Sequence, residues 1–216
     1  RRLSTMLHLE RELARGGAGL VAGVDEAGVG PLVGPVIAAA VIFATDAPTL
    51  PVKDSKLLSP CVRASLAARI RACALAIGVG RADVWEIATL NVYHATLLAM
   101  RRAVDSLAVA PGHVLVDARV IPGLGMPQTA VIRGDAKHYS IAAASILAKT
   151  WRDALMEELD ARYPAYGFAR HKGYGTAEHR DAIRRYGPCP EHRMSYAALV
   201  EIQGSRHTDR DASGSV

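Results

Sequence analysis

The sequence predicts an α/β domain built around a five-stranded mixed sheet with flanking helices. Five short apolar or β-prone runs alternate with segments whose apolar residues recur at helical spacing, which is typical of this fold class. A Gly/Pro-rich stretch joins the first two runs and is too short for a crossover helix, so these two strands should pair antiparallel. The sheet is therefore expected to be mixed.

The predicted strands are short, and several of them end beside an acidic residue. The first is a short apolar run stopped by Asp25, the fourth ends at Asp117, and the fifth ends just before Gly134-Asp135. The five predicted strands span residues 19–24, 35–43, 77–80, 113–116 and 130–133.

Helical spacing predicts four helices. Ser59-Pro60 supplies an N-cap followed by proline at the first helical position, which marks the start of the second. The third is expected to break near Leu90-Asn91, and the fourth holds the most regular 3.6-residue period. The predicted helices span residues 6–15, 59–76, 83–107 and 140–162.

Composition and length indicate one globular unit. The 216 residues are 50% apolar and 22% charged, which excludes a disordered chain. We expect residues 1–162 to form the main α/β domain, 163–202 to form a helical extension of the same unit, and 203–216, which lack core-forming residues, to be a disordered tail.

The three cysteines and the apolar runs bear on the compartment. The cysteines are far apart, odd in number and without a C-x-x-C motif, which argues against a disulfide framework or a structural zinc site. No apolar run reaches the length of a membrane span, and the first residues lack the apolar block of a signal peptide. We therefore expect a cytoplasmic protein with no membrane partner.

Positive charge gathers near the C-terminus. Residues 162–193 carry seven Lys and Arg against three acids, an excess of four in a chain whose net charge is +5. Five aromatic residues are interleaved with them, which favours a polyanionic partner, nucleic acid first. A solvated basic surface is the alternative.

Four carboxylates are the candidate catalytic and metal-binding residues. Asp25 and Glu26 end the first strand, Asp117 ends the fourth, and Asp135 follows the fifth. Ligands of open α/β sheets bind outside the carboxyl ends of strands, and acids gathered there repel one another unless cations lie between them. Oxygen ligands suit Mg²⁺ or Mn²⁺, and two such ions would balance four carboxylates. Each acid alone could instead be a strand-end or turn residue.

The glycines after the first strand do not form a dinucleotide-binding loop. Gly28, Gly30 and Gly34 miss the G-x-G-x-x-G spacing by one residue, and Pro31 and Pro35 disfavour the helix that would hold a pyrophosphate. What remains is a backbone that a ligand can approach closely.

Several motifs resemble the type II ribonucleases H, in order and over roughly residues 5–196. The similarity rests on VDEAGVGPLVGPV (24–36), DSK (54–56), the acid after 114–116, GDAK (134–137) with SIAAASILAK (140–149), HKGYGT (171–176) and GPCPEH (187–192).

The resemblance implies an RNase H-like fold with a small C-terminal helical part. It also implies a monomeric, metal-dependent endonuclease that uses two Mg²⁺ or Mn²⁺ ions. Such an enzyme cuts RNA in RNA–DNA hybrids and the 5′ side of single ribonucleotides in duplex DNA, leaving a 3′-hydroxyl and a 5′-phosphate.

Roles of individual residues follow from the same resemblance. Asp25, Glu26, Asp117 and Asp135 become the catalytic acids and metal ligands. The backbone of Gly28, Val29 and Gly30, together with Tyr174, recognises the ribose 2′-hydroxyl. This hydroxyl is the group that distinguishes RNA from DNA. The phosphate-side or supporting residues that the resemblance implies are Lys56, Ser140, Lys149 and Arg152.

One residue departs from the family pattern, because Val29 stands where the family usually has Arg. Arg would add a cation beside the substrate backbone, whereas Val is uncharged and stiff. Two alternatives therefore stay open: a weakened or inactive protein that binds hybrids, and another nuclease of the same fold, such as a junction resolvase.

Overall fold

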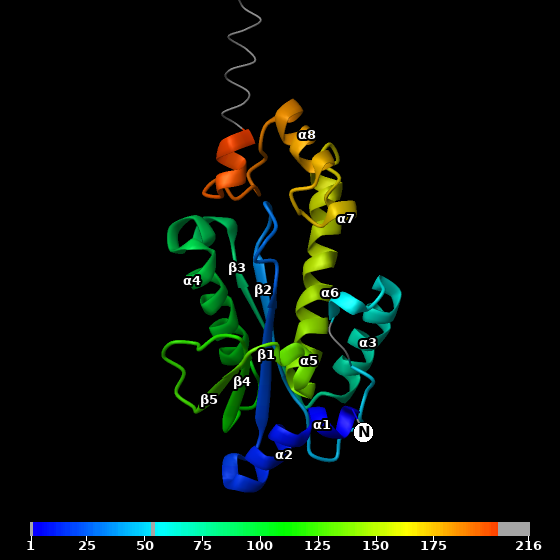
Figure 1. Cartoon of the computed structure of the whole chain (residues 1–216), viewed down its shortest axis with the longest axis vertical. Helices are drawn as coiled ribbons and strands as arrows, with labels where there is room; N and C mark the ends of the chain where they lie inside the picture. The colour runs from blue at the N-terminus through cyan, green and yellow to red at the C-terminus, as the bar shows by residue number, and fades with distance from the viewer. Residues whose placement is uncertain (1, 53–54, 203–216) are drawn as a thin grey trace, which may run out of the picture.

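The computed structural model describes residues 2–52 and 55–202, in which one sheet lies between two layers of helices (Figure 1). The strands are β1 (Val21–Ala27), β2 (Val36–Ile42), β3 (Ala76–Ala82), β4 (His113–Asp117) and β5 (Gln128–Val131). Their order across the sheet is β3-β2-β1-β4-β5. β2 pairs antiparallel with β1 and β3, whereas β1–β4 and β4–β5 are parallel. The predicted α/β class and the five-stranded mixed sheet are confirmed.

The helices precede, separate and follow the strands along the chain. They are α1 (Arg2–Met6), α2 (His8–Leu13), the π-helical η1 (Ala14–Ala18), the 3-10 helix η2 (Ser55–Leu57), α3 (Pro60–Cys73), α4 (Val84–Asp105), α5 (Gly134–Lys137), α6 (Tyr139–Arg162), α7 (Phe168–His171) and α8 (Ala177–Tyr186). A further helix covers 197–202.

Two local expectations can be compared with these bounds. The helix expected at 6–15 is confirmed over His8–Leu13 as α2, but its bounds differ, because α1 ends at Met6 and the chain continues into η1 from Ala14. The expected break near Leu90-Asn91 is confirmed, because Asn91 has φ 64° inside α4. The Asn91 side chain accepts hydrogen bonds from the amides of Tyr93 and His94, at 3.0 and 3.2 Å, and so restarts the helix.

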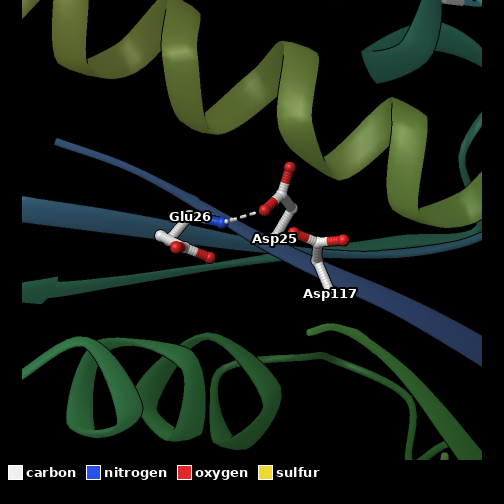
Figure 2. Close-up of side chains that lie close together, drawn as sticks. All are labelled: Asp25, Glu26 and Asp117. Carbon is white, nitrogen blue, oxygen red and sulfur yellow. Dashed lines mark hydrogen bonds between the residues drawn. The ribbon is translucent and has the colours of Figure 1, made fainter. Parts of the chain in front are cut away.

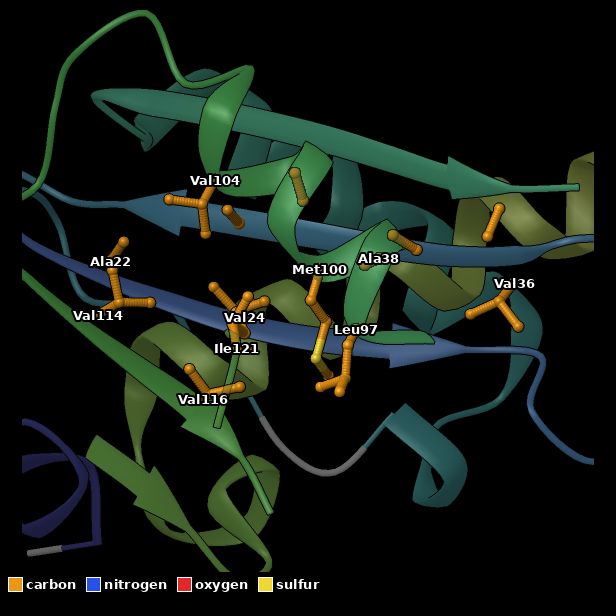
Figure 3. Packing of buried hydrophobic residues seen from close by; sticks show 14 of the residues in the cluster. Ala22, Val24, Val36, Ala38, Leu97, Met100, Val104, Val114, Val116 and Ile121 are labelled. Atoms are coloured by element: carbon orange, nitrogen blue, oxygen red, sulfur yellow. The ribbon is translucent and has the colours of Figure 1, made fainter. Parts of the chain in front are cut away.

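Both faces of the sheet are buried at its central strands β1, β2 and β4. Val24, Val116 and Met100 of α4 belong to the cluster on one face (Figure 3), and α3 and α6 cover the other with Leu66 and Ile146. β1 and α6 pack so closely that a Cβ on Gly23 would stand 2.2 Å from the carbonyl carbon of Ser140. This contact fixes α6 against the strand that ends in the paired acids.

Residues 163–202 pack against the C-terminal end of α6 and against 32–33 through a separate apolar cluster. Its buried members include Val33, Met156, Phe168, Ile183 and Leu199. The boundary at residue 162 stays a prediction, and the expected disorder of 203–216 concerns residues outside the described ones. None of the helices described for this chain is long and apolar enough to cross a membrane.

Candidate active site

Three of the four predicted acids meet at the ends of two neighbouring strands. β1 and β4 run parallel and pair up to Val24 and Val116, so the acids that follow them come side by side. One carboxylate oxygen each from Asp25, Glu26 and Asp117 lies within 4.8 Å of the others. Figure 2 shows the three side chains gathered on the sheet beside the α6 ribbon. This is a compact set of hard oxygen donors.

Burial makes this cluster electrostatically costly. Asp25 is only 5% exposed, and burial raises its pKa well above the usual range, with further increases from the Glu26 and Asp117 charges. A hydrogen bond from the Glu26 amide to Asp25 Oδ1, at 2.7 Å, and one from the Ser145 hydroxyl partly oppose this rise. The charges of the cluster therefore favour a bound cation.

Asp117 is positioned by a backbone amide, and Glu26 by an ion pair. The Gly134 amide donates to Asp117 Oδ1 at 2.6 Å. Glu26 forms an ion pair with Arg119 through one oxygen, while its Oε2 is buried with no hydrogen-bond partner among the described residues. Asp117 is followed by Ala118 at φ 55°, a left-handed residue that turns the chain toward Arg119. An unpaired buried carboxylate oxygen is a suitable metal ligand.

Most predicted site residues line one cavity of about 190 Å³ around the acids. The structure adds Ser55 and Ser145, whose hydroxyl oxygens lie 2.9 Å apart. Ser145, Lys149 and Arg152 are spaced four and three residues apart on α6, a signal that could have identified Ser145 from sequence. The predicted site residues lining the cavity are Asp25, Glu26, Gly28, Val29, Gly30, Asp117, Asp135, Lys149, Arg152 and Tyr174.

Two cations approach the cavity from α6. Lys149 Nζ lies 2.6 Å from Asp153 Oδ1, and burial lowers the pKa of Lys149. Arg152 is 1% exposed and donates to the Lys172 and Val33 carbonyls, at 3.0 and 3.2 Å. Burial, followed by the nearby Arg193 charge, lowers the pKa of Arg152 to about 10. Arg152 therefore remains cationic near neutral pH.

The turn after β1 and the C-terminal tyrosine lie together. Gly28 has φ +99°, a conformation that L side chains rarely adopt. A Cβ on Gly30 would lie 3.7 Å from Tyr174 Cε1, so the aromatic ring lies beside the turn. Tyr174 is 49% exposed and therefore accessible from solvent. The geometry thus places two distant segments of sequence around one small space.

Two predicted substrate-binding residues are not placed in this cavity. Ser140 is 2% exposed and lines a different cavity, where its amide and hydroxyl donate to Glu10 Oε1 at 3.1 and 2.9 Å. Ser140 lies at the start of α6, before the face that carries Ser145. Its predicted phosphate-side or supporting role stays a prediction. The Lys56 side chain and all of Asp54 lie outside the described parts of the chain.

Comparisons with known proteins identify the sequence family. A family model described as Ribonuclease HII matches residues 22–199. The chain is 56% identical over 203 residues to a Ribonuclease HII of Anaeromyxobacter sp. (strain Fw109-5), covering 94% of this chain and 64% of that protein. It is 53% identical over 201 residues to a Ribonuclease HII of Geobacillus kaustophilus (strain HTA426), covering 93% and 77%.

A solved structure gives the same result for the fold. The crystal structure of the ribonuclease H2 from Pyrococcus horikoshii OT3 is similar with a TM-score of 0.74 and 26% identity, covering 87% of this chain and 99% of that one. The RNase H-like fold implied by the sequence motifs is therefore confirmed. The chain spans less than two thirds of the Anaeromyxobacter relative's length.

Proposed function

Because the chain belongs to the ribonuclease HII family, we propose that it is an endoribonuclease that cleaves the RNA strand of RNA–DNA hybrids. It also cuts duplex DNA on the 5′ side of a single embedded ribonucleotide, leaving a 3′-hydroxyl and a 5′-phosphate. One observation carries this proposal: a single cavity joins the four acids to the Gly28–Gly30 turn and to Tyr174.

The acids fit Mg²⁺ or Mn²⁺. The donor set of Asp25, Glu26 and Asp117 is all oxygen, and the unpaired Glu26 Oε2 and the raised Asp25 pKa both reflect a charge that a cation would stabilise. These three acids and Asp135 would hold two ions during catalysis. Bound there, the ions would generate the attacking hydroxide and stabilise the leaving oxygen.

The remaining residues of the cavity bind and orient the substrate. Lys149 and Arg152 place positive charge beside the acids and so favour an approaching phosphodiester. The backbone of the Gly28–Gly30 turn and the Tyr174 hydroxyl contact the ribose 2′-hydroxyl, which is the only difference from DNA at that sugar. Lys56 follows Ser55, which lines the cavity, and is retained as a phosphate-side residue on the strength of its motif.

We also propose that the protein acts as a monomer in the cytoplasm. Within one chain, the four acids, the Gly28–Gly30 turn and Tyr174 already come together around one cavity. Cys61, Cys73 and Cys189 are all free thiols, as expected in a reducing compartment.

Two alternatives make different predictions. A protein that only binds hybrids would recognise the ribonucleotide without cutting it, and a nuclease such as a junction resolvase would cut without needing a 2′-hydroxyl. The four acids of this cavity argue against the first, and the turn beside Tyr174 argues against the second.

Three duplexes of one sequence test the proposal: all DNA, an RNA–DNA hybrid, and DNA with one ribonucleotide, each with Mg²⁺, with Mn²⁺ and with EDTA. We expect metal-dependent cleavage of the second and third, with the third cut on the 5′ side of the ribonucleotide. Cleavage of all-DNA duplex at a similar rate would overturn the proposed specificity. Binding without cleavage in either metal would overturn the proposed activity.

A further inference from the structure

The segment 189–196 lies directly behind the turn that follows β1. Arg193 in this segment is 0% exposed, although arginine side chains are rarely buried completely. Its guanidinium donates to three backbone carbonyls of the turn region: Gly28 at 2.6 Å, Val29 at 2.9 Å and Gly34 at 2.8 Å. One rigid cation therefore gathers three carbonyls that would otherwise repel one another.

Tyr196 adds to these contacts between Arg193 and the turn. Its hydroxyl donates to the Val29 carbonyl at 2.7 Å and accepts from Arg193 Nη1 at 2.8 Å, while its ring lies 5.3 Å from the guanidinium carbon. The Val29 carbonyl thus has two donors from the same segment. Such a bifurcated anchor fixes the orientation of the peptide plane as well as its position.

Fixing the carbonyls also orients the amides of the turn. In a planar trans peptide, the N–H group points away from the preceding C=O group. Because the carbonyls of Gly28 and Val29 point toward Arg193, the amides of Val29 and Gly30 must point to the opposite side. Both of these residues line the cavity that contains the acids and Tyr174.

His192, the residue before Arg193, is linked through His179 to the backbone of Tyr174. The Tyr174 carbonyl accepts from His179 Nδ1 at 2.9 Å, His179 Nε2 lies 3.1 Å from His192 Nε2, and the Cys189 amide donates to His192 Nδ1 at 2.9 Å. A carbonyl accepts only, so His179 carries its proton on Nδ1 and His192 on Nε2. All three hydrogen bonds are satisfied when both imidazoles are neutral.

We propose that Arg193 is a positioning residue for ribonucleotide recognition. Together, His192 and Arg193 hold Tyr174 and the backbone amides of Val29 and Gly30 in position around the same cavity. This inference rests on the proposed function, since it assigns the support of the same ribose-reading site. Arg193 acts through the backbone of the turn and does not itself line the cavity.

Two substitutions separate this role from simple stability. Arg193→Lys keeps the charge but cannot reach three carbonyls with a planar fork, and Tyr196→Phe removes one hydroxyl while keeping the ring. The control is Arg184→Lys, since Arg184 is an exposed residue of α8 that pairs with Asp181. Each protein is first shown to be folded by its melting transition, and Tyr196→Phe carries the test should Arg193→Lys not fold.

The decisive readout is the ratio of the affinity for the single-ribonucleotide duplex to the affinity for the all-DNA duplex, together with kcat/KM for the single-ribonucleotide duplex. We expect the ratio to fall about tenfold in Arg193→Lys and roughly fivefold in Tyr196→Phe, as for a lost hydrogen bond or two. The affinity for the all-DNA duplex should stay unchanged in both variants. The control Arg184→Lys should match the wild type in all of these measurements.

Each other result has a defined meaning. An unchanged ratio in folded Tyr196→Phe and Arg193→Lys, or an equal loss of affinity for both duplexes, would overturn the inference while leaving the proposed function intact. If the wild-type protein did not distinguish the two duplexes, the proposed function itself would fall, and this inference with it.

Discussion

Arg152 lies across Gly28 so closely that a Cβ at position 28 would stand 2.2 Å from the arginine Nε and 2.9 Å from the Pro35 carbonyl oxygen. The same glycine has φ +99°. A side chain at this point of the turn must therefore displace a buried cation and strain the backbone at once.

Gly28→Ala should accordingly lower the melting temperature and nearly abolish cleavage. We expect a loss of about 1–3 kcal/mol in the free energy of unfolding, the range for backbone strain at such a position. Gly30→Ala is the matched control, because a Cβ there meets only Tyr174 Cε1 at 3.7 Å, and its stability should stay within about 0.5 kcal/mol of the wild type. Equal stability of Gly28→Ala and wild type in urea unfolding would contradict this account.

Asp25→Asn should remove nearly all turnover while the melting temperature in EDTA holds or rises. A carboxyl whose pKa is raised by folding costs stability as pH rises through the values between its unfolded and folded pKa, and Asn removes that cost. Asp135→Asn should likewise remove turnover. Asp105→Asn, at an exposed ion pair with Arg101, should change neither quantity. Substantial turnover of Asp25→Asn in millimolar Mg²⁺ would argue against a metal site.

Tyr174→Phe should reduce discrimination for a ribonucleotide more than it reduces duplex binding. The ring beside Gly30 stays, while one hydrogen bond worth on the order of 1 kcal/mol is lost, which corresponds to about fivefold in kcat/KM. Tyr186→Phe, at another exposed tyrosine, serves as the control. If Tyr174→Phe cleaved single-ribonucleotide duplexes at the wild-type rate, the Tyr174 hydroxyl would not be a group that recognises the ribonucleotide.

Val29→Arg should strengthen substrate binding, and the gain should shrink as salt rises. The Val29 carbonyl is anchored by Arg193 and Tyr196, so the turn should keep its shape when the side chain changes. One added phosphate contact should steepen the dependence of log affinity on log salt by roughly 0.9, with a gain of about tenfold at low salt. Val29→Gln controls for size without charge. Identical salt slopes for Val29→Arg and wild type would mean that another cation already makes this contact.

The paired histidines predict a pH dependence. Burial lowers the pKa of His179 and of His192 to about 4. Between pH about 6.5 and 4 the unfolded chain binds protons that the folded chain does not, so stability falls as pH falls through this window. Each unit of lowered pKa is worth about 1.4 kcal/mol. Imidazole NMR resonances should show both residues neutral down to about pH 4 in the folded protein. If both histidines titrated near pH 6.5 in the folded state, as they should in urea, the hydrogen bonds that link Tyr174 to Cys189 through two neutral imidazoles would be contradicted.

Sequence reasoning located the acids because each follows an apolar run, and strand ends are readable from pattern alone. It did not locate Arg119, which is near Asp117 in sequence but pairs with Glu26 only because Ala118 turns the chain. It did not separate Ser140, which lines another cavity, from Ser145, since membership of α6 says nothing about which of its turns reaches the acids. Ser145, five residues further along α6, lines the cavity together with Ser55.

The sequence by itself determined the α/β class, the mixed sheet and the identities of the four acids, because hydrophobic periodicity and local turn chemistry are encoded over a few residues. Only the tertiary structure decided that β1 lies beside β4, which brings Asp25 next to Asp117 across about ninety residues of chain. It also decided that Arg193 is buried behind Gly28. Arginine usually remains in solvent, and three carbonyls of a distant turn, together with Tyr196, stabilise this charge inside the protein.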